Sequence, residues 1–175
     1  MWQSYDLTLH LNSFSGESLL SHLFLAFIIN IYLLGIFAFL GFALPTQKIL
    51  PESYYKIKND KPLLFWYKLL RVNMFRIFLL HTFWKNKKQQ KNYFNGKIND
   101  LNSFSEQSKK SEFGHFIALF IIFLFTICLL YLTLYLAAFL TTILNIISNL
   151  YPVILQRHHR HRIQKIQNLW IIKNA

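Results

Sequence analysis

Residues that give a soluble protein its cross-links, loops and surface charge are scarce in this sequence of 175 residues, which has one cysteine, five glycines, four prolines and seven acidic residues. The single cysteine, Cys128, excludes a disulfide scaffold. So few glycines and prolines argue against a loop-rich or disordered chain. Charge is absent from residues 116–155, and also from residues 23–44. These runs are longer than the core of a soluble domain needs, so a soluble globular enzyme is excluded.

The two uncharged runs predict three membrane-spanning helices. Residues 19–44 are long enough for one transmembrane helix. The second run has 40 residues, and a single helix of that length would be about 60 Å long, roughly twice the thickness of the hydrocarbon core. We therefore expect a transmembrane helical hairpin over residues 112–156, with its turn near residues 133–137. The sequence thus predicts an all-α integral membrane protein that forms a single membrane domain.

Positive charge is confined to the later parts of the chain. Nineteen lysines and arginines oppose seven acidic residues, for a net charge of +12, and none of the nineteen precedes Lys48. Basic flanks of spanning helices tend to stay in the cytoplasm. We therefore expect residues 1–18 to lie outside the cell, residues 85–111 to form a cytoplasmic loop and residues 157–175 to form a basic cytoplasmic tail. Three spans satisfy this arrangement, which predicts a multi-pass protein of the cell membrane with its N-terminus outside and its C-terminus in the cytoplasm.

The charge pattern also indicates which partners to expect. No basic start and no small-residue cleavage site accompany the first apolar run, so we interpret residues 19–44 as a retained anchor rather than a signal peptide. No nucleic-acid-binding motif accompanies the basic excess. We therefore expect membrane lipids with anionic headgroups, and no nucleic acid, as partners.

Residues 45–84 separate the first span from the hairpin. Three prolines favour a loop over residues 45–62. Residues 63–84 are long enough to cross the membrane, but Lys68, Arg71 and Arg76 fall within an arc of about 140° on a helical wheel, opposite apolar side chains. This pattern is typical of an amphipathic helix that lies in the membrane interface or re-enters it. A fourth span would also be inconsistent with the positions of the basic segments, which three spans place in the cytoplasm.

The first candidate site is the segment SEFGH at the start of the third apolar helix. Glu112 and His115 are three residues apart, so they share one face of a helix. A carboxylate beside an imidazole can fix its tautomer and raise its basicity, as a general base acting on a hydroxyl requires. The alternative is an ordinary helix N-terminus, at which Ser111 caps the helix and the helix dipole favours Glu112.

The second candidate site is the segment NLYPVILQRHHRHR at the end of the last span. Asn149 and Gln156 are seven residues apart, so their amides can face one side of the helix. Arg157, Arg160 and Arg162 follow them, and guanidinium groups bind phosphate or carboxylate through paired hydrogen bonds. The alternative is a basic flank that only stops the transfer of the chain through the membrane.

Histidines in the same segment could suggest a metal site. His158, His159 and His161, together with Glu112, are residue types that bind zinc. No cysteine or carboxylate lies near these histidines in the sequence, so a basic tail is the better interpretation and we expect no metal. The predicted hairpin brings both candidate segments to one membrane face.

Three blocks resemble a known family, the small membrane acyltransferases typified by glycosyl-diaponeurosporenoate acyltransferase, which completes staphyloxanthin-type carotenoid synthesis. The blocks are FWYKLLRVNMFR, KKSEFGH and NLYPVILQRHHRHR, and they follow the order and spacing of the family. The resemblance runs from Pro51 to Arg162, about two-thirds of the chain, and its last block is the most specific. His158 and His159 depart from the family pattern, which usually has Tyr and Asn there.

The resemblance implies a membrane acyltransferase that moves a fatty acyl chain onto a hydroxyl of a glycosylated carotenoid or similar lipid. The residues at the polar motif positions of the family are Glu112, His115, Asn149, Gln156, Arg157, Arg160 and Arg162.

By this interpretation His115, oriented by Glu112, would take the proton of the acceptor hydroxyl. Asn149 or Gln156 would stabilise the oxyanion, while the arginines would hold an anionic donor. The donor would be an acyl thioester or another acyl donor, and neither a cofactor nor an enzyme nucleophile would be needed. The alternative from a different class is a non-catalytic membrane subunit of a larger complex.

Overall fold

The computed structural model describes residues 19–82, Lys85 and residues 100–174, the last four by their backbone alone. The predictions for residues 1–18 and for most of residues 85–99 lie outside these described residues. In chain order the helices are α2 (Leu19–Ala43), η1 (Thr46–Lys48), α3 (Glu52–Tyr55), α4 (Lys61–Leu69), α5 (Val72–Thr82), α7 (Leu101–Tyr131), α8 (Tyr135–Asn145), η3 (Ile146–Leu150) and α9 (Tyr151–Asn174). The described part of the chain contains no strand, so the predicted all-α class is confirmed.

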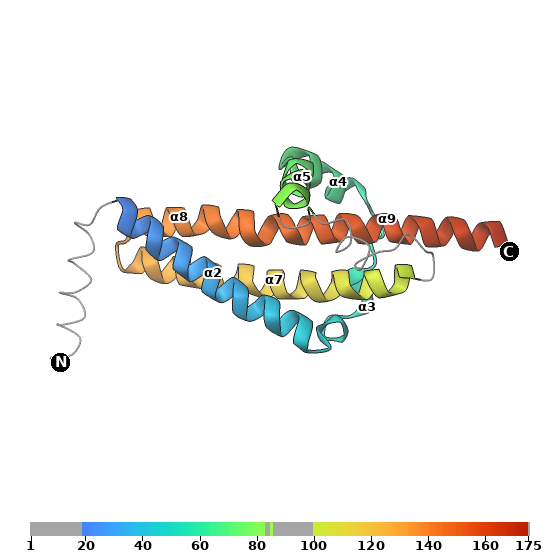
Figure 1. The fold of residues 1–175 in the computed structure, drawn as a ribbon, viewed down its shortest axis with the longest axis horizontal. Coiled ribbons are helices and arrows are strands. Elements are labelled where there is room, and N and C mark those ends of the chain that lie inside the picture. Colours follow the sequence, from blue (N-terminus) through green and yellow to red (C-terminus); the bar gives the residue numbers. More distant parts are fainter. Residues whose placement is uncertain (1–18, 83–84, 86–99, 175) are drawn as a thin grey trace.

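Three helical rods run side by side and form the body of the molecule (Figure 1). They are α2, α7 and the continuous rod of α8, η3 and α9, and each contains a stretch that is long and apolar enough to cross a membrane. Large apolar side chains such as Phe24, Phe123 and Phe139 are more than half exposed on them. Such a surface suits lipid rather than water. The predicted N-terminal span and C-terminal hairpin of a multi-pass membrane protein are confirmed.

The hairpin turns over residues 132–134, at the start of the predicted range, although no glycine or proline marks it. Thr133 adopts a positive φ of 60°. Its N–H donates to the Leu130 carbonyl, and the Leu134 N–H donates to the Leu129 carbonyl, both at 3.0 Å. These two bonds form a Schellman motif, which satisfies the last carbonyls of α7. Leu129 and Leu134 pack together in a buried apolar cluster, so this contact compensates for the strained threonine.

Glycines bring α2 and α7 into close contact. A Cβ atom at Gly114 would lie 2.7 Å from the carbonyl oxygen of Phe37, and one at Gly41 would lie 3.0 Å from that of Lys110. The two backbones therefore approach as closely as glycine alone permits, as at small-residue crossings of membrane helices. This contact fixes the part of α7 that carries the first candidate site.

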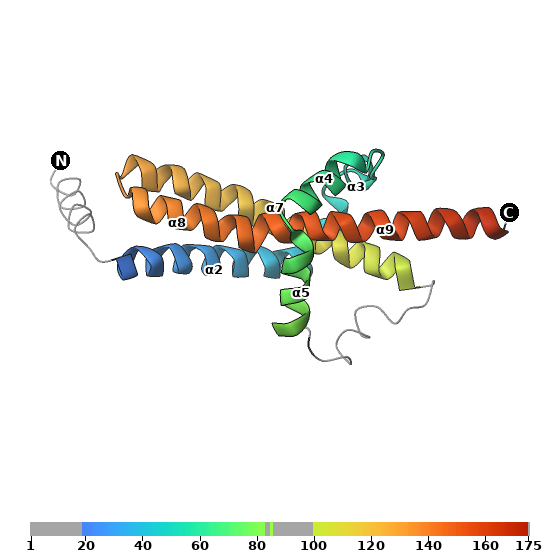
Figure 2. The same ribbon diagram turned by 90° about the horizontal axis from the view of Figure 1, so that it is seen from above.

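The structure divides the interfacial segment into two short helices, where we expected one helix over residues 63–84. Arg71 has a positive φ of 49° and separates α4 from α5. With nine and eleven residues, these helices are about 14 and 17 Å long, too short to span the bilayer. They lie across α9 rather than along it (Figure 2). Val72 is fully buried between them and packs against Ile154 and Leu155 of α9.

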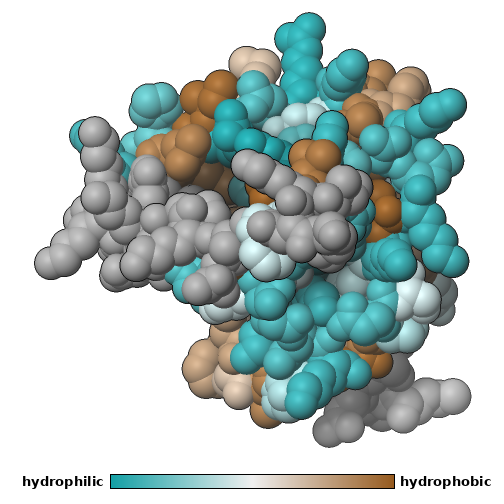
Figure 3. Space-filling model, turned by 90° about the vertical axis from the view of Figure 1, so that its right-hand side faces the viewer, coloured by the Kyte–Doolittle hydropathy of each residue, from teal (hydrophilic) through white to brown (hydrophobic). Residues whose placement is uncertain are grey.

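Helix also extends into segments that we expected to be a loop and a tail. α7 begins at Leu101, inside the predicted loop of residues 85–111, and α9 continues to Asn174. The two segments pack on each other, because Leu101 is buried and the Gln167 amide donates to Asn102 Oδ1 at 2.8 Å. They extend the hairpin beyond its apolar spans. The end of the molecule that they form is largely hydrophilic (Figure 3).

Candidate functional site

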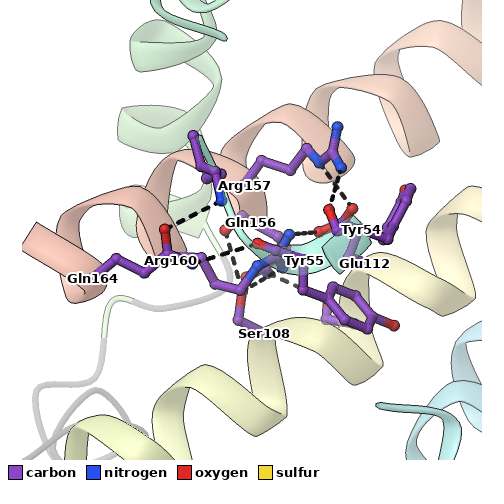
Figure 4. A network of polar contacts seen from close by, with 10 residues as sticks. Tyr54, Tyr55, Ser108, Glu112, Gln156, Arg157, Arg160 and Gln164 are labelled. Atoms are coloured by element: carbon purple, nitrogen blue, oxygen red, sulfur yellow. Dashed lines mark hydrogen bonds and ion pairs between the residues drawn. The ribbon is translucent and has the colours of Figure 1, made fainter. Parts of the chain in front are cut away.

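Glu112 lies at the centre of a buried cluster of polar groups between α7 and α9 (Figure 4). Its carboxylate is fully buried and forms ion pairs with two arginines. Arg157 Nε lies 3.1 Å from Oε1, and Arg160 pairs with Oε2 through Nη2. Arg160 is only 1% exposed. Desolvation of a carboxylate this deep costs several kcal/mol, which its attraction to the arginines offsets. Because one carboxylate lies between two guanidinium groups, these three side chains carry a net positive charge.

Hydroxyl and amide groups of the two helices complete the cluster. Ser108 Oγ accepts a hydrogen bond from Arg160 Nη1 at 3.4 Å and donates to the Gln156 carbonyl at 3.2 Å. The side-chain amide of Gln156 donates to Ser111 Oγ at 3.2 Å. The structure therefore brings Glu112, Gln156 and two of the three predicted arginines together, and Gln156 reaches α7 through a serine.

Two tyrosines of α3 cover the arginines, and sequence reasoning missed both. The Arg157 guanidinium lies 4.6 Å from the ring centre of Tyr54 and donates to its carbonyl oxygen at 3.1 Å. Arg160 lies 5.0 Å from the ring centre of Tyr55. Burial, and then the negative charge of Glu112, raise the pKa of each phenol to about 12. Both phenols therefore stay protonated at physiological pH, and neither is a base.

Contacts to both long helices hold α3 over the cluster. Gln164 of α9 donates to the Tyr55 carbonyl at 3.4 Å and accepts a hydrogen bond from the Ile57 N–H at 3.3 Å. Lys109 of α7 lies 2.5 Å from the Glu52 carboxylate. The sequence signal for this arrangement was the pair of adjacent aromatic residues between two prolines, in a segment that we interpreted only as a loop.

His115 is oriented by Asn149 rather than by Glu112. Nδ1 of His115 lies 3.2 Å from Asn149 Oδ1. The Asn149 amide nitrogen donates to Asn145 Oδ1 at 2.9 Å and to Ser148 Oγ at 3.1 Å, so its oxygen accepts the proton on Nδ1. That tautomer leaves the lone pair on Nε2. The expected pairing of His115 with Glu112 is replaced, because the carboxylate oxygens of Glu112 bind arginines.

A π-helical segment positions the asparagines. The turn of helix in η3 is wider than an α-helical turn and contains about one residue more. Such π-helical segments often mark functional sites. Asn149 in this segment and Asn145 just before it are both buried, and the Asn145 amide donates to the Leu119 carbonyl of α7 at 3.0 Å. The two asparagines therefore join the returning rod to α7 at a level that is closer to the hairpin turn than the cluster around Glu112.

The remaining predicted residues lie apart from this cluster. Arg162 is exposed. His158 stacks on Tyr67 with ring centres 4.1 Å apart, and His161 Nε2 lies 3.5 Å from Asp60 Oδ2. His158 thus contacts α4, whereas His161 contacts the residue just before this helix. In the described ranges no three His, Cys, Asp or Glu side chains gather closely enough to hold a metal ion.

Two cavities flank the rod that carries Asn149. The first, of about 620 Å³, lies between α4 and α9, with Tyr54 and Arg157 in its wall. The second, of about 430 Å³, lies between α7 and α8, with Phe116 and Asn145 in its wall. Ile146 borders both cavities. The hydrogen-bonded chain from Asn145 through Asn149 thus starts at the second cavity and ends at the imidazole.

Comparison with known proteins identifies a family for this region. A family model described as glycosyl-4,4'-diaponeurosporenoate acyltransferase matches residues 51–168, about two-thirds of the chain. The matched range contains α3, the cluster around Glu112, the pair of His115 and Asn149, and both cavities. No curated protein and no solved structure matches the chain.

Proposed function

Because this chain belongs to the glycosyl-4,4'-diaponeurosporenoate acyltransferase family, we propose that it transfers a fatty acyl chain onto a hydroxyl of a glycosylated carotenoid or a similar membrane lipid. The observation that carries the proposal is the hydrogen bond from His115 Nδ1 to Asn149. It holds the imidazole in the tautomer that can take a proton at Nε2, as general base catalysis on a hydroxyl requires.

The proposed reaction is a direct transfer. The acceptor hydroxyl oxygen attacks the acyl carbonyl carbon of the donor while His115 Nε2 takes the hydroxyl proton. The tetrahedral intermediate then collapses, and the bond between the carbonyl carbon and the leaving group breaks. The leaving group departs as a thiolate or alkoxide and receives the proton from His115. The products are the acylated acceptor and the protonated leaving group, so the step balances without a cofactor or an enzyme nucleophile.

In this proposal the side-chain amide of Gln156 stabilises the developing oxyanion. We expected either Asn149 or Gln156 in that role. The Asn149 amide nitrogen already donates to Asn145 and Ser148, whereas the Gln156 amide donates one described hydrogen bond, to Ser111. The second N–H group of Gln156 is the one that could donate to an oxyanion.

The function is tested by product analysis. We expect that a host making the glycosylated carotenoid, when given this gene, accumulates an acylated product that mass spectrometry detects and that the empty-vector strain lacks. A protein that reaches the membrane but leaves the acceptor unacylated would contradict the proposal. Purification with stoichiometric partner proteins in that case would favour the alternative, a non-catalytic subunit of a membrane complex.

We further propose that the N-terminus lies outside the cell and the C-terminus in the cytoplasm. The hairpin turn and the start of α2 lie at one end of the molecule, and the hydrophilic end shown in Figure 3 lies at the other (Figure 1). Basic segments favour the cytoplasm. In a Cys128→Ser background, an impermeant maleimide should label Thr133→Cys in intact cells and Leu169→Cys only after permeabilisation. The reverse labelling pattern would overturn this orientation.

A further inference from the structure

We propose that the cavity between α4 and α9 binds the acyl donor through a phosphate group that the donor carries. This inference rests on the proposed transferase function, and it names the chemical class of one of the two substrates. The donor fits the description of an anionic amphiphile, such as an acyl-coenzyme A or an acidic phospholipid.

The rim of the cavity is cationic. Lys56, Lys58 and Arg157 all border it, and none of the described lining residues is acidic. Both lysines are exposed and come from the segment between α3 and α4. Three cations around one opening attract an anion, and phosphate oxygens accept hydrogen bonds from both lysine and arginine.

Arg157 has capacity to bind a second anion. Glu112 carries one negative charge and pairs with two guanidinium groups. Arg160 is almost fully buried and contacts Ser108 and the Tyr55 ring within the cluster, whereas the Arg157 side chain is 33% exposed and lines the cavity. Its orientation is fixed by Glu112, the Tyr54 carbonyl and the Tyr54 ring. Arg157 is therefore a pre-oriented cation in the lining of the cavity, and its charge is only partly compensated because Glu112 is shared with Arg160.

The interior of the cavity is apolar and elongated. Leu63 and Trp66 of α4 form one wall, and Leu150 and Ile154 of the long rod form the other. From Arg157 to Ile146 the lining extends along the rod for about 16 Å, at 1.5 Å per residue. A hydrocarbon chain can lie in this space while its headgroup stays at the cationic rim.

The positive charge of the rim indicates which of the two substrates binds in the cavity. The family name describes an acceptor with a glycosyl group, and a sugar offers no negative charge to three cations. Of the two substrates, the donor is the one whose headgroup can carry phosphate. The apolar interior and cationic rim together therefore match the donor rather than the acceptor.

Binding of lauroyl-coenzyme A to the purified full-length protein in detergent tests this inference. We expect the double variant Lys56→Gln/Lys58→Gln to bind it about five- to tenfold more weakly than the wild type, the range for two partly exposed charge contacts. Binding to the wild type should also weaken as salt rises, because exposed charges are screened. The matched control is Lys48→Gln, which removes an exposed lysine that does not line the cavity, and it should bind like the wild type.

Two further probes separate the outcomes. Lauroyl-N-acetylcysteamine has the same thioester but no phosphate, so it should bind weakly and equally to the wild type and the double variant. Vesicles of phosphatidylglycerol that compete with lauroyl-coenzyme A, where phosphatidylcholine vesicles do not, would identify a lipid source of the phosphate. Unchanged affinity of the double variant for lauroyl-coenzyme A would overturn the proposal. Binding is read without transfer, so a failure of the proposed function would show separately as absent product with intact binding.

Discussion

Replacement of His115 by alanine is expected to lower the rate of acyl transfer by about 10²- to 10⁴-fold, the usual contribution of a general base. The variant removes the nitrogen that takes the hydroxyl proton, together with the side-chain contacts to Asn149 and to the backbone of Ser148, and it leaves the apolar spans unchanged. The protein should therefore still reach the membrane. Transfer measured with saturating donor and acceptor checks the prediction, and His81→Ala, which removes an exposed histidine of α5, is the matched control.

Asn149 offers an independent test of the same mechanism, because it is a positioning residue that acts through His115. Asn149→Ala should lower kcat with little change in KM, since it removes the acceptor that fixes the imidazole tautomer. It should also alter the pH dependence of kcat, which a merely structural role would not do selectively. Wild-type rates in the His115→Ala protein would eliminate the proposed mechanism.

Replacement of Glu112 by glutamine is expected to destabilise the folded protein by about 3–5 kcal/mol, the cost of leaving a buried charge unpaired. Arg160 is 1% exposed and cannot release its proton, so its charge would stay buried without a carboxylate. Arg157 would lose the same partner. Unfolding in mixed micelles, followed by circular dichroism, measures the free energy difference.

Two other variants provide reference values for the expected loss of stability. Glu52→Gln removes a carboxylate that is 79% exposed and paired with Lys109, so it should cost no more than about 1 kcal/mol. Arg160→Met leaves Glu112 paired with Arg157 and should therefore cost less than Glu112→Gln. Equal stability of Glu112→Gln and the wild type would mean that the carboxylate does not compensate the buried guanidinium groups.

The membrane architecture was largely predictable from the sequence, because entry into a bilayer depends on local apolar length. Two uncharged runs and the thickness of the hydrocarbon core were enough to predict three spans and a hairpin. The division of the interfacial segment at Arg71 was not predictable, since the positive φ there is adopted by an arginine and not by a glycine. The helical extension from Leu101 was missed because a polar segment becomes helical there by packing against α9.

The sequence by itself determined which segments enter the membrane and that two polar motifs return to the same end of the hairpin. Only the tertiary structure decided which polar groups bind each other. Glu112 and His115 share one helix, yet one pairs with arginines and the other with Asn149. Partner choice depends on how far each helix is rotated toward its neighbour. The close backbone contact of Gly114 with α2 and the π-helical turn in η3 both contribute to that rotation, and neither is revealed by the spacing of residues along the sequence.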